Sequence, residues 1–226
     1  MHIEIIYEDE EIVLVNKPSG TAVHASAGHE DGSLADYLAA SRPCMRKVGS
    51  PSRPGVVHRL DIETSGIMIF AKTPRAYSAL RRDFETHRNL EKTYLAVLHG
   101  APKPAQGRLT TLIGRKAWDP RRMEVSESSG SEAVSEWQLL KRNGPVALVE
   151  FKIKTGRTHQ IRVHAAHLGH PIVGDALYGD PKKDLRLKTK PRRLLLHAVE
   201  LAFNHPTSRR YLSFAACPPD DIVYAG

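Results

Sequence analysis

The stretch HRLDIETSG, residues 58–66, lies between two apolar runs, PGVV before it and IMIFAK after it. Runs of β-branched and apolar residues are typical of buried strands, so VVHRL and IMIFAK are both predicted to be strands. Asp61 then falls at the end of a buried strand, two residues after Arg59. A buried carboxylate is costly unless it is paired and hydrogen-bonded. The stretch therefore predicts that another part of the chain supplies a partner for Asp61.

Strand and helix signals alternate on both sides of this stretch. IEIIY and IVLVN, separated by the acidic EDEE, predict a β-hairpin. Ser33 predicts the start of a helix through SLADYLAAS, with Asp36 in capping-box position. Residues 42–54 are predicted to form a loop because they are rich in Pro, Ser and Gly. Thr73 and Pro74 predict a cap and first turn for the helix PRAYSALRRDFETHR.

Most elements predicted after that helix are strands. The strand candidates are KTYLAVLHG, 108–113, 132–140, 146–154, LLLHAVELAF and RRYLSFAA. A Pro/Gly loop is expected at 101–107, and one helix is expected at 158–168, with Gly169 as its C-terminal stop. Several strands follow one another without a crossover helix. We therefore predict an α+β fold with a largely antiparallel mixed sheet and flanking helices.

Composition places the 226-residue chain among soluble globular proteins, because 41% of its residues are hydrophobic and 26% are charged. The sequence has no run of 18 apolar residues and no signal-peptide pattern, so we expect a cytoplasmic protein without a membrane span. Cys44 and Cys217 are too few and too far apart for a disulfide framework or a zinc site. We expect a single domain over residues 1–226, acting as a monomer.

Basic residues exceed acidic ones by 33 to 25, which gives a formal net charge of +8. The excess is clustered in three segments, at 42–53, 115–122 and 182–193. Clustered positive charge suits a polyphosphate partner, because neutralised phosphates release condensed counterions. Charge alone favours nucleic acid only slightly over an ordinary solvated basic surface.

The partner of Asp61 is expected in the segment KTGRTHQIRVHAAHLGH, residues 154–170. This segment offers Arg157 in a turn and Arg162 one turn into the predicted helix. The apolar stripe of that helix is formed by Ile161, Ala165 and Leu168. An arginine beside a carboxylate lowers the carboxylate's pKa and keeps it nucleophilic at neutral pH. A purely structural ion pair is the alternative interpretation.

Three linked motifs carry a resemblance to a known family. They are HRLDIETSG at 58–66, EKTYLAVLHG at 91–100 and TGRTHQIRVHAAHLGHPIVGD at 155–175. In this order and spacing they resemble the RluA-type family of pseudouridine synthases, whose pattern is HRLDxxTSG, then a K-x-Y strand, then GR-[ST]-HQ-[IL]-RVH. NKPSG at 16–20 and LLLHA at 194–198 resemble the family's flanking segments. The resemblance covers nearly the whole chain.

The resemblance implies a pseudouridine synthase fold with a central catalytic cleft, without the additional N-terminal S4-like RNA-binding domain of some relatives. It implies that Asp61 is the catalytic nucleophile and that Arg162 is its salt-bridge partner. Tyr94 would stack on the uracil and assist proton transfer, and Arg59 would fill the gap left by the extruded base. Further RNA contacts are expected from His58, Thr64, Arg157, Lys188, Lys190, Arg192 and Arg193.

The implied reaction converts uridine to pseudouridine in structured rRNA or tRNA and needs neither a redox cofactor nor a metal. A carboxylate can attack C1′ of the ribose or C6 of the base, or it can promote elimination. A base inside stacked RNA must first be extruded, at a cost of roughly a few kcal/mol. An arginine wedge two residues from the nucleophile suits this step.

The sequence also offers one rival site and two alternative functions. Four histidines, His159, His164, His167 and His170, suggest a metal site, but they follow no H-x-x-x-H pattern on one helical face and no cysteine is near. A non-catalytic RNA-binding protein or chaperone would have no need of the set Asp61, Tyr94 and Arg162. A nucleobase glycosylase would also flip a base and use a carboxylate, but it would release the base.

Overall fold

The computed structural model describes residues 3–25 and 32–223 and divides the chain into two compact units. Unit 1 consists of Met1–Glu91 and Ala198–Cys217. Unit 2 consists of Lys92–His197 and Pro218–Gly226. Within the described residues, no helix is both long and apolar enough to cross a membrane.

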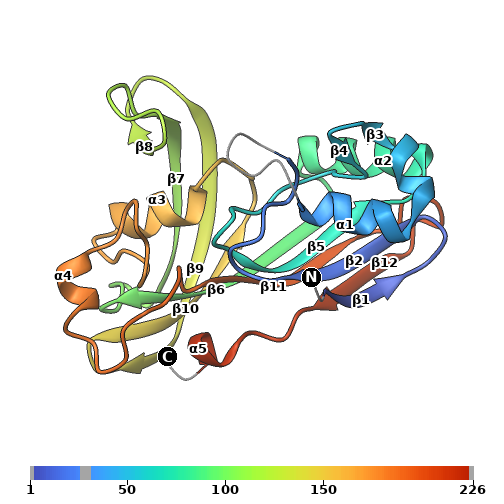
Figure 1. Cartoon of the computed structure of the whole chain (residues 1–226). Helices are drawn as coiled ribbons and strands as arrows, with labels where there is room; N and C mark the ends of the chain where they lie inside the picture. Colours follow the sequence, from blue (N-terminus) through green and yellow to red (C-terminus); the bar gives the residue numbers. More distant parts are fainter. Residues whose placement is uncertain (1–2, 26–31, 224–226) are drawn as a thin grey trace. The chain divides into compact units, whose positions relative to one another are not determined.

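Unit 1 is built on antiparallel strand pairs with two helices packed on them (Figure 1). Its strands are β1 (Glu4–Glu8), β2 (Ile12–Lys17), β5 (Ser65–Ala71), β11 (Leu196–Asn204, in unit 1 from Ala198) and β12 (Tyr211–Ala215). They lie in the order β1-β2-β5-β11-β12. β2 and β5 pair in register from Ile12 opposite Ala71 to Lys17 opposite Gly66. Strand β5 is buried along its whole length, as its apolar run predicts.

The two long helices of unit 1 begin at the capping residues predicted from the sequence. α1 (Leu34–Ser41) starts after Ser33, whose hydroxyl accepts a hydrogen bond from the Asp36 amide. α2 (Pro74–Thr86) starts after Thr73, whose hydroxyl accepts from the Ala76 amide. Both helices lie on the same side of the strands and bury small and apolar residues against them (Figure 1).

Two predictions in unit 1 were wrong. Residues 42–54 form a 3-10 helix (η1, Pro43–Lys47) and a short hairpin of β3 (Gly49–Ser50) and β4 (Arg53–Pro54) rather than an irregular loop. VVHRL is not a strand, since only Val56 makes an isolated bridge, to Phe70. Gly55, at φ +70°, turns the chain just before it. Val57 and Leu60 are nevertheless buried, so their apolar character serves loop packing and not strand pairing.

Unit 2 is a meander of antiparallel strands with one main helix. Its elements are β6 (Leu90–His99), β7 (Gln106–Arg115), β8 (Met123–Ser126), β9 (Ser131–Asn143), β10 (Val146–Ile153), α3 (Gln160–His167), α4 (Pro181–Asp184) and α5 (Asp220–Val223). The strand order is β6-β10-β9-β7-β8. The strands predicted here are confirmed; β8 was missed because its four partly buried residues, MEVS, carry no clear strand pattern.

Helix α3 packs on this sheet through the predicted apolar stripe. Ile161 and Ala165 join a buried cluster with Phe151 and Leu98 of the strands, and Leu168 packs against that cluster. Gly169 follows the helix at φ +80°, as predicted for its C-terminal stop. The predicted fold class, α+β with a largely antiparallel sheet, is confirmed.

Gly66, which closes the HRLDIETSG stretch, is required by the approach of β11. Its φ is +120°, and a Cβ at this position would collide with the backbone nitrogen and oxygen of Ala198. We expect Gly66→Ala to lower the free energy of unfolding by about 3 kcal/mol or more, since strain and collision add. Gly144→Ala is the control, because φ is +57° there but the space is open, so about 1–2 kcal/mol is expected. Equal losses in urea unfolding would contradict the role of the Ala198 contact.

Candidate active site

Asp61 opens a tight turn that connects the irregular segment after Val56 to strand β5. The Thr64 amide donates to the Asp61 carbonyl oxygen at 3.1 Å, which closes the turn. Thr64 and Leu60 are buried, whereas Asp61 is partly exposed and Arg59 is exposed. The turn therefore anchors itself through Leu60 and Thr64 and presents its charged side chains outward.

A fully buried lysine fixes this turn from the neighbouring NKPSG segment. The Lys17 ammonium donates to the carbonyl oxygens of Pro18, Thr21 and Ile62 at 3.0, 2.9 and 2.8 Å. The Gly20 amide also donates to Ile62 O, and the Ser19 hydroxyl donates to Glu63 O. Since Ile62 and Glu63 directly follow Asp61, these bonds hold the turn that carries the candidate nucleophile. Sequence reasoning had found NKPSG only as a flanking motif.

His58 is integrated into the framework of unit 1. Its Nε2 accepts a hydrogen bond from the Ile69 amide at 3.1 Å. Its ring stacks on Phe84 of α2, with 4.3 Å between centroids and 7° between planes. These contacts assign His58 a role in joining the segment before Asp61 to β5 and α2; its predicted RNA contact stays a prediction.

In unit 2, Arg162 of α3 makes a buried bidentate ion pair with Asp175. Its Nε and Nη2 donate to the two carboxylate oxygens at 2.8 and 2.7 Å. Burial alone would raise the pKa of Asp175, but hydrogen bonds and charge from Arg162 and the amides of Tyr178 and Leu177 outweigh it and hold the pKa below its usual value. The sequence reasoning did not single out Asp175, although it ends the third sequence motif.

Tyr178 lies beside this pair, and several side chains contact it. The Arg162 guanidinium is 5.2 Å from the ring centroid, and that of Arg122 is 5.7 Å away. The Tyr178 hydroxyl accepts from the Met123 amide at 2.7 Å and bonds to His159 Nδ1 at 2.8 Å. The ring thus lies between the guanidinium of Arg162, which Asp175 neutralises, and that of Arg122, both within cation–π distance.

Tyr94 lies on β6 opposite Phe151 of β10 and is partly exposed at the edge of the unit 2 core. Two residues earlier, Lys92 is buried and donates to the Thr155 carbonyl at 3.1 Å. Burial, helped by the positive charge of Arg157, lowers the pKa of Lys92 to about 8. The lysine of the K-x-Y motif thus connects the Tyr94 strand to the turn that precedes α3.

That turn is held by a buried polar network. The Gln160 side chain accepts from the Thr155 hydroxyl and the Arg157 amide, and it donates to Val134 O and Ser135 Oγ. The Arg157 guanidinium donates to Glu132 O at 2.8 Å. Every hydrogen-bonding atom of the Gln160 amide group is used, which fixes the start of α3 and hence the position of Arg162 on it.

The four histidines near α3 have separate environments. His159 bonds to Tyr178, His170 bonds to the His99 carbonyl, and His167 is exposed. His164 is fully buried between Ser135 and Thr111, at 2.9 Å from each hydroxyl. Among the described residues, no group of three or more His, Cys, Asp or Glu side chains is arranged to hold a metal ion.

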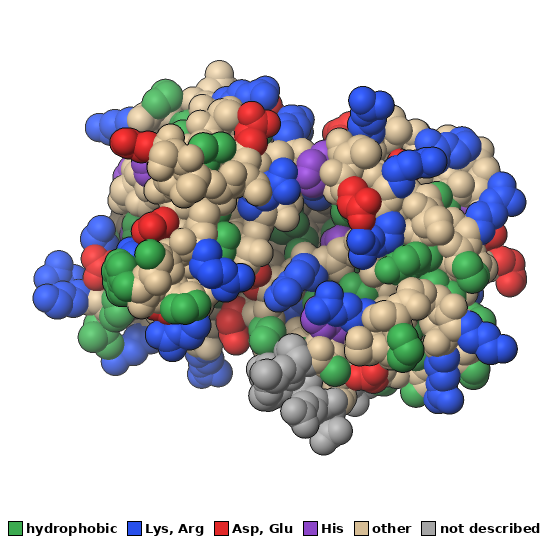
Figure 2. Space-filling view, turned by 90° about the horizontal axis from the view of Figure 1, so that it is seen from above, with side chains coloured by type: hydrophobic (Ala, Val, Ile, Leu, Met, Phe, Trp, Pro, Cys, Tyr) green, Lys and Arg blue, Asp and Glu red, His purple; other side chains and the backbone are tan. Residues whose placement is uncertain are grey.

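The basic segment 182–193 is mainly exposed. Its exposed basic residues are Lys182, Lys183, Arg186, Lys188, Lys190 and Arg192. Arg193 differs, because its guanidinium donates to Asp221 at 2.7 and 2.5 Å and to Leu194 O. Figure 2 shows Lys and Arg side chains over much of the visible surface, with fewer acidic ones. The exposed members are therefore available to an anionic partner, whereas Arg193 is held by an acidic neighbour.

A family model described as RNA pseudouridylate synthase matches residues 11–167. The chain belongs to this family, whose members are isomerases that act on RNA. The RluA-type resemblance inferred from the three motifs is thereby confirmed.

Relatives and solved structures agree with this assignment. An uncharacterized RNA pseudouridine synthase of Synechocystis is 39% identical over 219 residues, covering 96% of this chain and 66% of the relative. Ribosomal large subunit pseudouridine synthase D of Neisseria meningitidis is 39% identical over 230 residues, covering 99% of this chain and 60% of the relative. The chain thus spans slightly less than two thirds of the length of these curated relatives.

The solved structure of human RNA pseudouridylate synthase domain containing 1 superposes with a TM-score of 0.76 at 29% identity, covering 97% of this chain and 84% of that one. Human RNA pseudouridylate synthase domain containing 4 gives the same TM-score of 0.76 at 27% identity, covering 98% and 91%.

The clamp made by Lys17 predicts a local effect of its removal. Lys17→Met keeps the side-chain length but leaves three carbonyl oxygens without the ammonium, so we expect a loss of about 2–4 kcal/mol in unfolding free energy. Amide hydrogen exchange at Gly20 and Thr64 should accelerate, because the turn opens locally. Lys72→Met is the control: Lys72 binds Glu8 and the Asp9 carbonyl elsewhere in unit 1, so exchange at Gly20 and Thr64 should not change.

The buried His164 predicts a pH dependence of stability. Burial, with a smaller effect of the charge on His167, lowers its pKa from 6.5 to about 4. Between these values the unfolded chain binds a proton that the folded chain does not, so the free energy of unfolding falls as the pH falls, by up to roughly 3 kcal/mol. His164→Gln can keep hydrogen bonds to Ser135 and Thr111, and it should remove the part of the pH dependence that is due to the imidazole. Identical pH profiles of the wild type and the variant in urea unfolding would refute it.

Proposed function

We propose that this protein isomerises specific uridines to pseudouridine in structured RNA, extruding the target base and using Asp61 as the nucleophile. The observation that carries the proposal is the turn that begins at Asp61. It matches the family's HRLDxxTSG motif, and a fully buried ammonium and two further hydrogen bonds from NKPSG hold it in place. A carboxylate placed on so constrained a turn suits a nucleophile that must meet its target accurately.

The proposed reaction exchanges one glycosidic bond for another. The N1–C1′ bond of uridine breaks, a C5–C1′ bond forms, a proton leaves C5 and N1 ends protonated, so the composition of the RNA is unchanged. Asp61 supplies the carboxylate, whether by attack on C1′ or C6 or by promoting elimination. Tyr94 stacks on the uracil and takes part in the proton transfer from C5.

Arg162 completes the proposed site as the cationic partner of Asp61. A guanidinium carries five N–H donors, and the bidentate pair with Asp175 uses two, so that pair is compatible with a second carboxylate. Asp175 fixes the plane of the guanidinium and thereby pre-orients it. We infer that Asp175 is a positioning residue for Arg162, a role that sequence reasoning did not assign.

RNA capture is proposed to combine a wedge with basic contacts. Arg59, exposed two residues before Asp61, would fill the gap in the stack when the base is extruded. Thr64 and Arg157 would assist near the site, and the exposed Lys188, Lys190 and Arg192 would bind phosphates. Arg193 would act less directly because of its pair with Asp221. We further propose a cytoplasmic monomer that acts on rRNA or tRNA; the similarity to the Neisseria meningitidis protein named ribosomal large subunit pseudouridine synthase D supports rRNA.

The decisive change is Asp61→Asn, which keeps the size of the side chain but removes its nucleophilic charge. With RNA carrying tritium at C5 of uridine, we expect tritium release to fall by at least about 1,000-fold. RNA affinity should stay within about tenfold, equivalent to ~1.4 kcal/mol. Glu63→Gln is the matched control, since Glu63 is an exposed carboxylate of the same turn and its variant should keep its activity.

The products decide between this function and its alternatives. Pseudouridine-specific chemical labelling should map the modified uridines, with the RNA mass unchanged. Release of free uracil would instead favour a glycosylase, and tight RNA binding by the wild type without either product would favour a non-catalytic binder. Appreciable pseudouridine formation by folded Asp61→Asn would refute the role of Asp61. Thermal unfolding of each variant distinguishes lost chemistry from lost structure.

A further inference from the structure

The loop between β7 and β8 carries an exposed aromatic side chain. Trp118 is 74% exposed, the highest value among the large hydrophobic residues in the part of the chain that the structure describes. The loop is closed at its base by a hydrogen bond from the Lys116 amide to Arg122 O, and the Arg122 amide donates to Asp119 O. A single exposed tryptophan is compatible with an ordinary protein surface, so the chemistry around Trp118 decides whether it suits a ligand.

The charges around Trp118 indicate the chemistry of that ligand. The Lys116 ammonium lies 4.4 Å from the indole centroid, over one face of the ring. Arg121 is 81% exposed, and its Nε and Nη2 donate to the two Asp119 carboxylate oxygens at 3.2 and 3.5 Å. Arg115 is also exposed. An apolar protein partner would be disfavoured by so many cations, whereas an aromatic ring among cations suits a nucleobase with its flanking phosphates.

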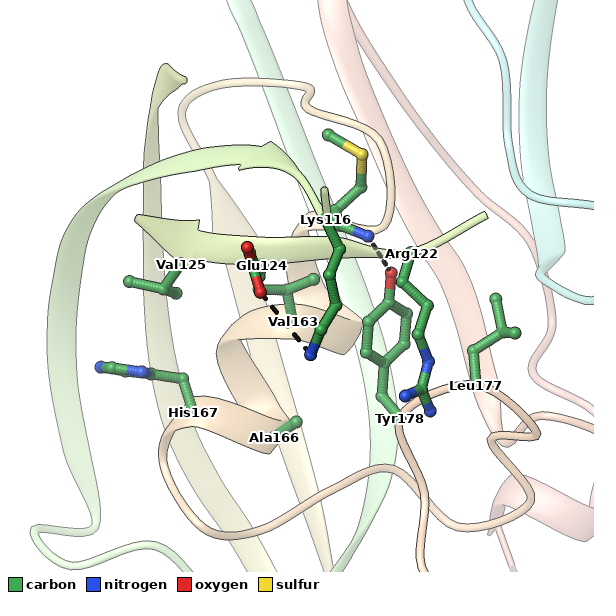
Figure 3. A pocket seen from close by; sticks show the side chains of 10 residues that line it. Lys116, Arg122, Glu124, Val125, Val163, Ala166, His167, Leu177 and Tyr178 are labelled. Atoms are coloured by element: carbon green, nitrogen blue, oxygen red, sulfur yellow. Dashed lines mark hydrogen bonds and ion pairs between the residues drawn. The ribbon is translucent and has the colours of Figure 1, made fainter. Parts of the chain in front are cut away.

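A pocket of about 330 Å³ adjoins this loop within unit 2. Figure 3 shows Lys116 reaching into it beside Glu124, with Arg122 next to the Tyr178 ring. Helix α3 forms its opposite wall through Val163, Ala166 and His167. Lys116 and Arg122 therefore belong to both the loop and the pocket, which makes the pocket a continuation of the exposed aromatic site.

We propose that the β7–β8 loop is a second RNA-binding site, in which an unpaired nucleobase stacks on the open face of Trp118. The phosphates on either side of that base bind Arg121 and the pair Lys116 and Arg122 that lines the pocket. The proposal rests on RNA being the substrate and deepens that function, because it assigns a contact for an unstacked nucleotide outside the reacting uridine. Any nucleobase can stack on an aromatic ring, so the site contributes affinity and not sequence specificity.

The tryptophan content of the chain allows a direct test. Of the two tryptophans, Trp137 is only 8% exposed and donates to the Pro104 carbonyl, so Trp118 is the one that a ligand can reach. The folded Asp61→Asn protein is titrated with a short single-stranded oligouridylate while tryptophan emission is recorded. We expect saturable quenching, because stacking places the base in contact with the indole. An abasic oligonucleotide with the same phosphates should quench far less.

Variants separate stacking from charge. Trp118→Ala should weaken oligouridylate binding by at least about fivefold, the lower end for loss of one stacked base. Trp118→Phe keeps an aromatic face and should bind within about threefold of the parent while losing the quenching. Leu140→Ala, at another exposed apolar side chain of unit 2, is the control and should change neither. Equal quenching by the abasic strand, or unchanged affinity of Trp118→Ala, would overturn the proposal.

The outcome is independent of catalysis. Pseudouridine formation by the wild type without quenching would reject this site and leave the proposed function intact. Quenching without pseudouridine formation by the wild type would support this site and reject the proposed function.

Discussion

The ammonium group of Lys17 is the interaction on which the Asp61 region depends. It is fully buried at the end of β2, and all three of its protons are donated to backbone carbonyls. A charge in this position is tolerable because polar partners such as these carbonyls replace water. The loop of NKPSG and the turn after Asp61 must therefore come together around it. One buried cation thus holds together the NKPSG loop and the turn after Asp61, which are irregular and far apart in sequence.

Unit 2 also contains a buried cation, but there a carboxylate compensates the charge instead of backbone carbonyls. The buried guanidinium of Arg162 donates to both carboxylate oxygens of Asp175. Two backbone amides, those of Leu177 and Tyr178, donate to the same carboxylate. Such a pair adds little net stability, since desolvation offsets most of the attraction, but removal of one member leaves a buried charge. A guanidinium held at two nitrogens has a defined plane, which suits the positioning role proposed for Asp175.

The predictions that held were those supported by local chemistry. Ser33 and Thr73 cap the helices they were expected to cap, because a hydroxyl that satisfies a free helical amide needs only its near neighbours. The strand predicted for VVHRL was wrong because its conformation depends on packing and not on near neighbours. Its apolar residues are buried, yet burial in a loop and burial in a strand leave the same short pattern in the sequence. The hairpin within 42–54 was hidden by residues typical of loops.

Three motifs in fixed order were enough to predict the family, and with it the fold class and the candidates Asp61, Tyr94 and Arg162. The partners that hold the segments around these residues are apparent only in the folded chain. Lys17 reaches Ile62 across 45 positions of chain, Lys92 reaches Thr155 across 63, and Asp175 meets Arg162 beyond the end of its helix. No local pattern encodes such contacts, because a buried charge takes whichever carbonyl or carboxylate the packed chain brings within reach, and packing is a property of the whole unit.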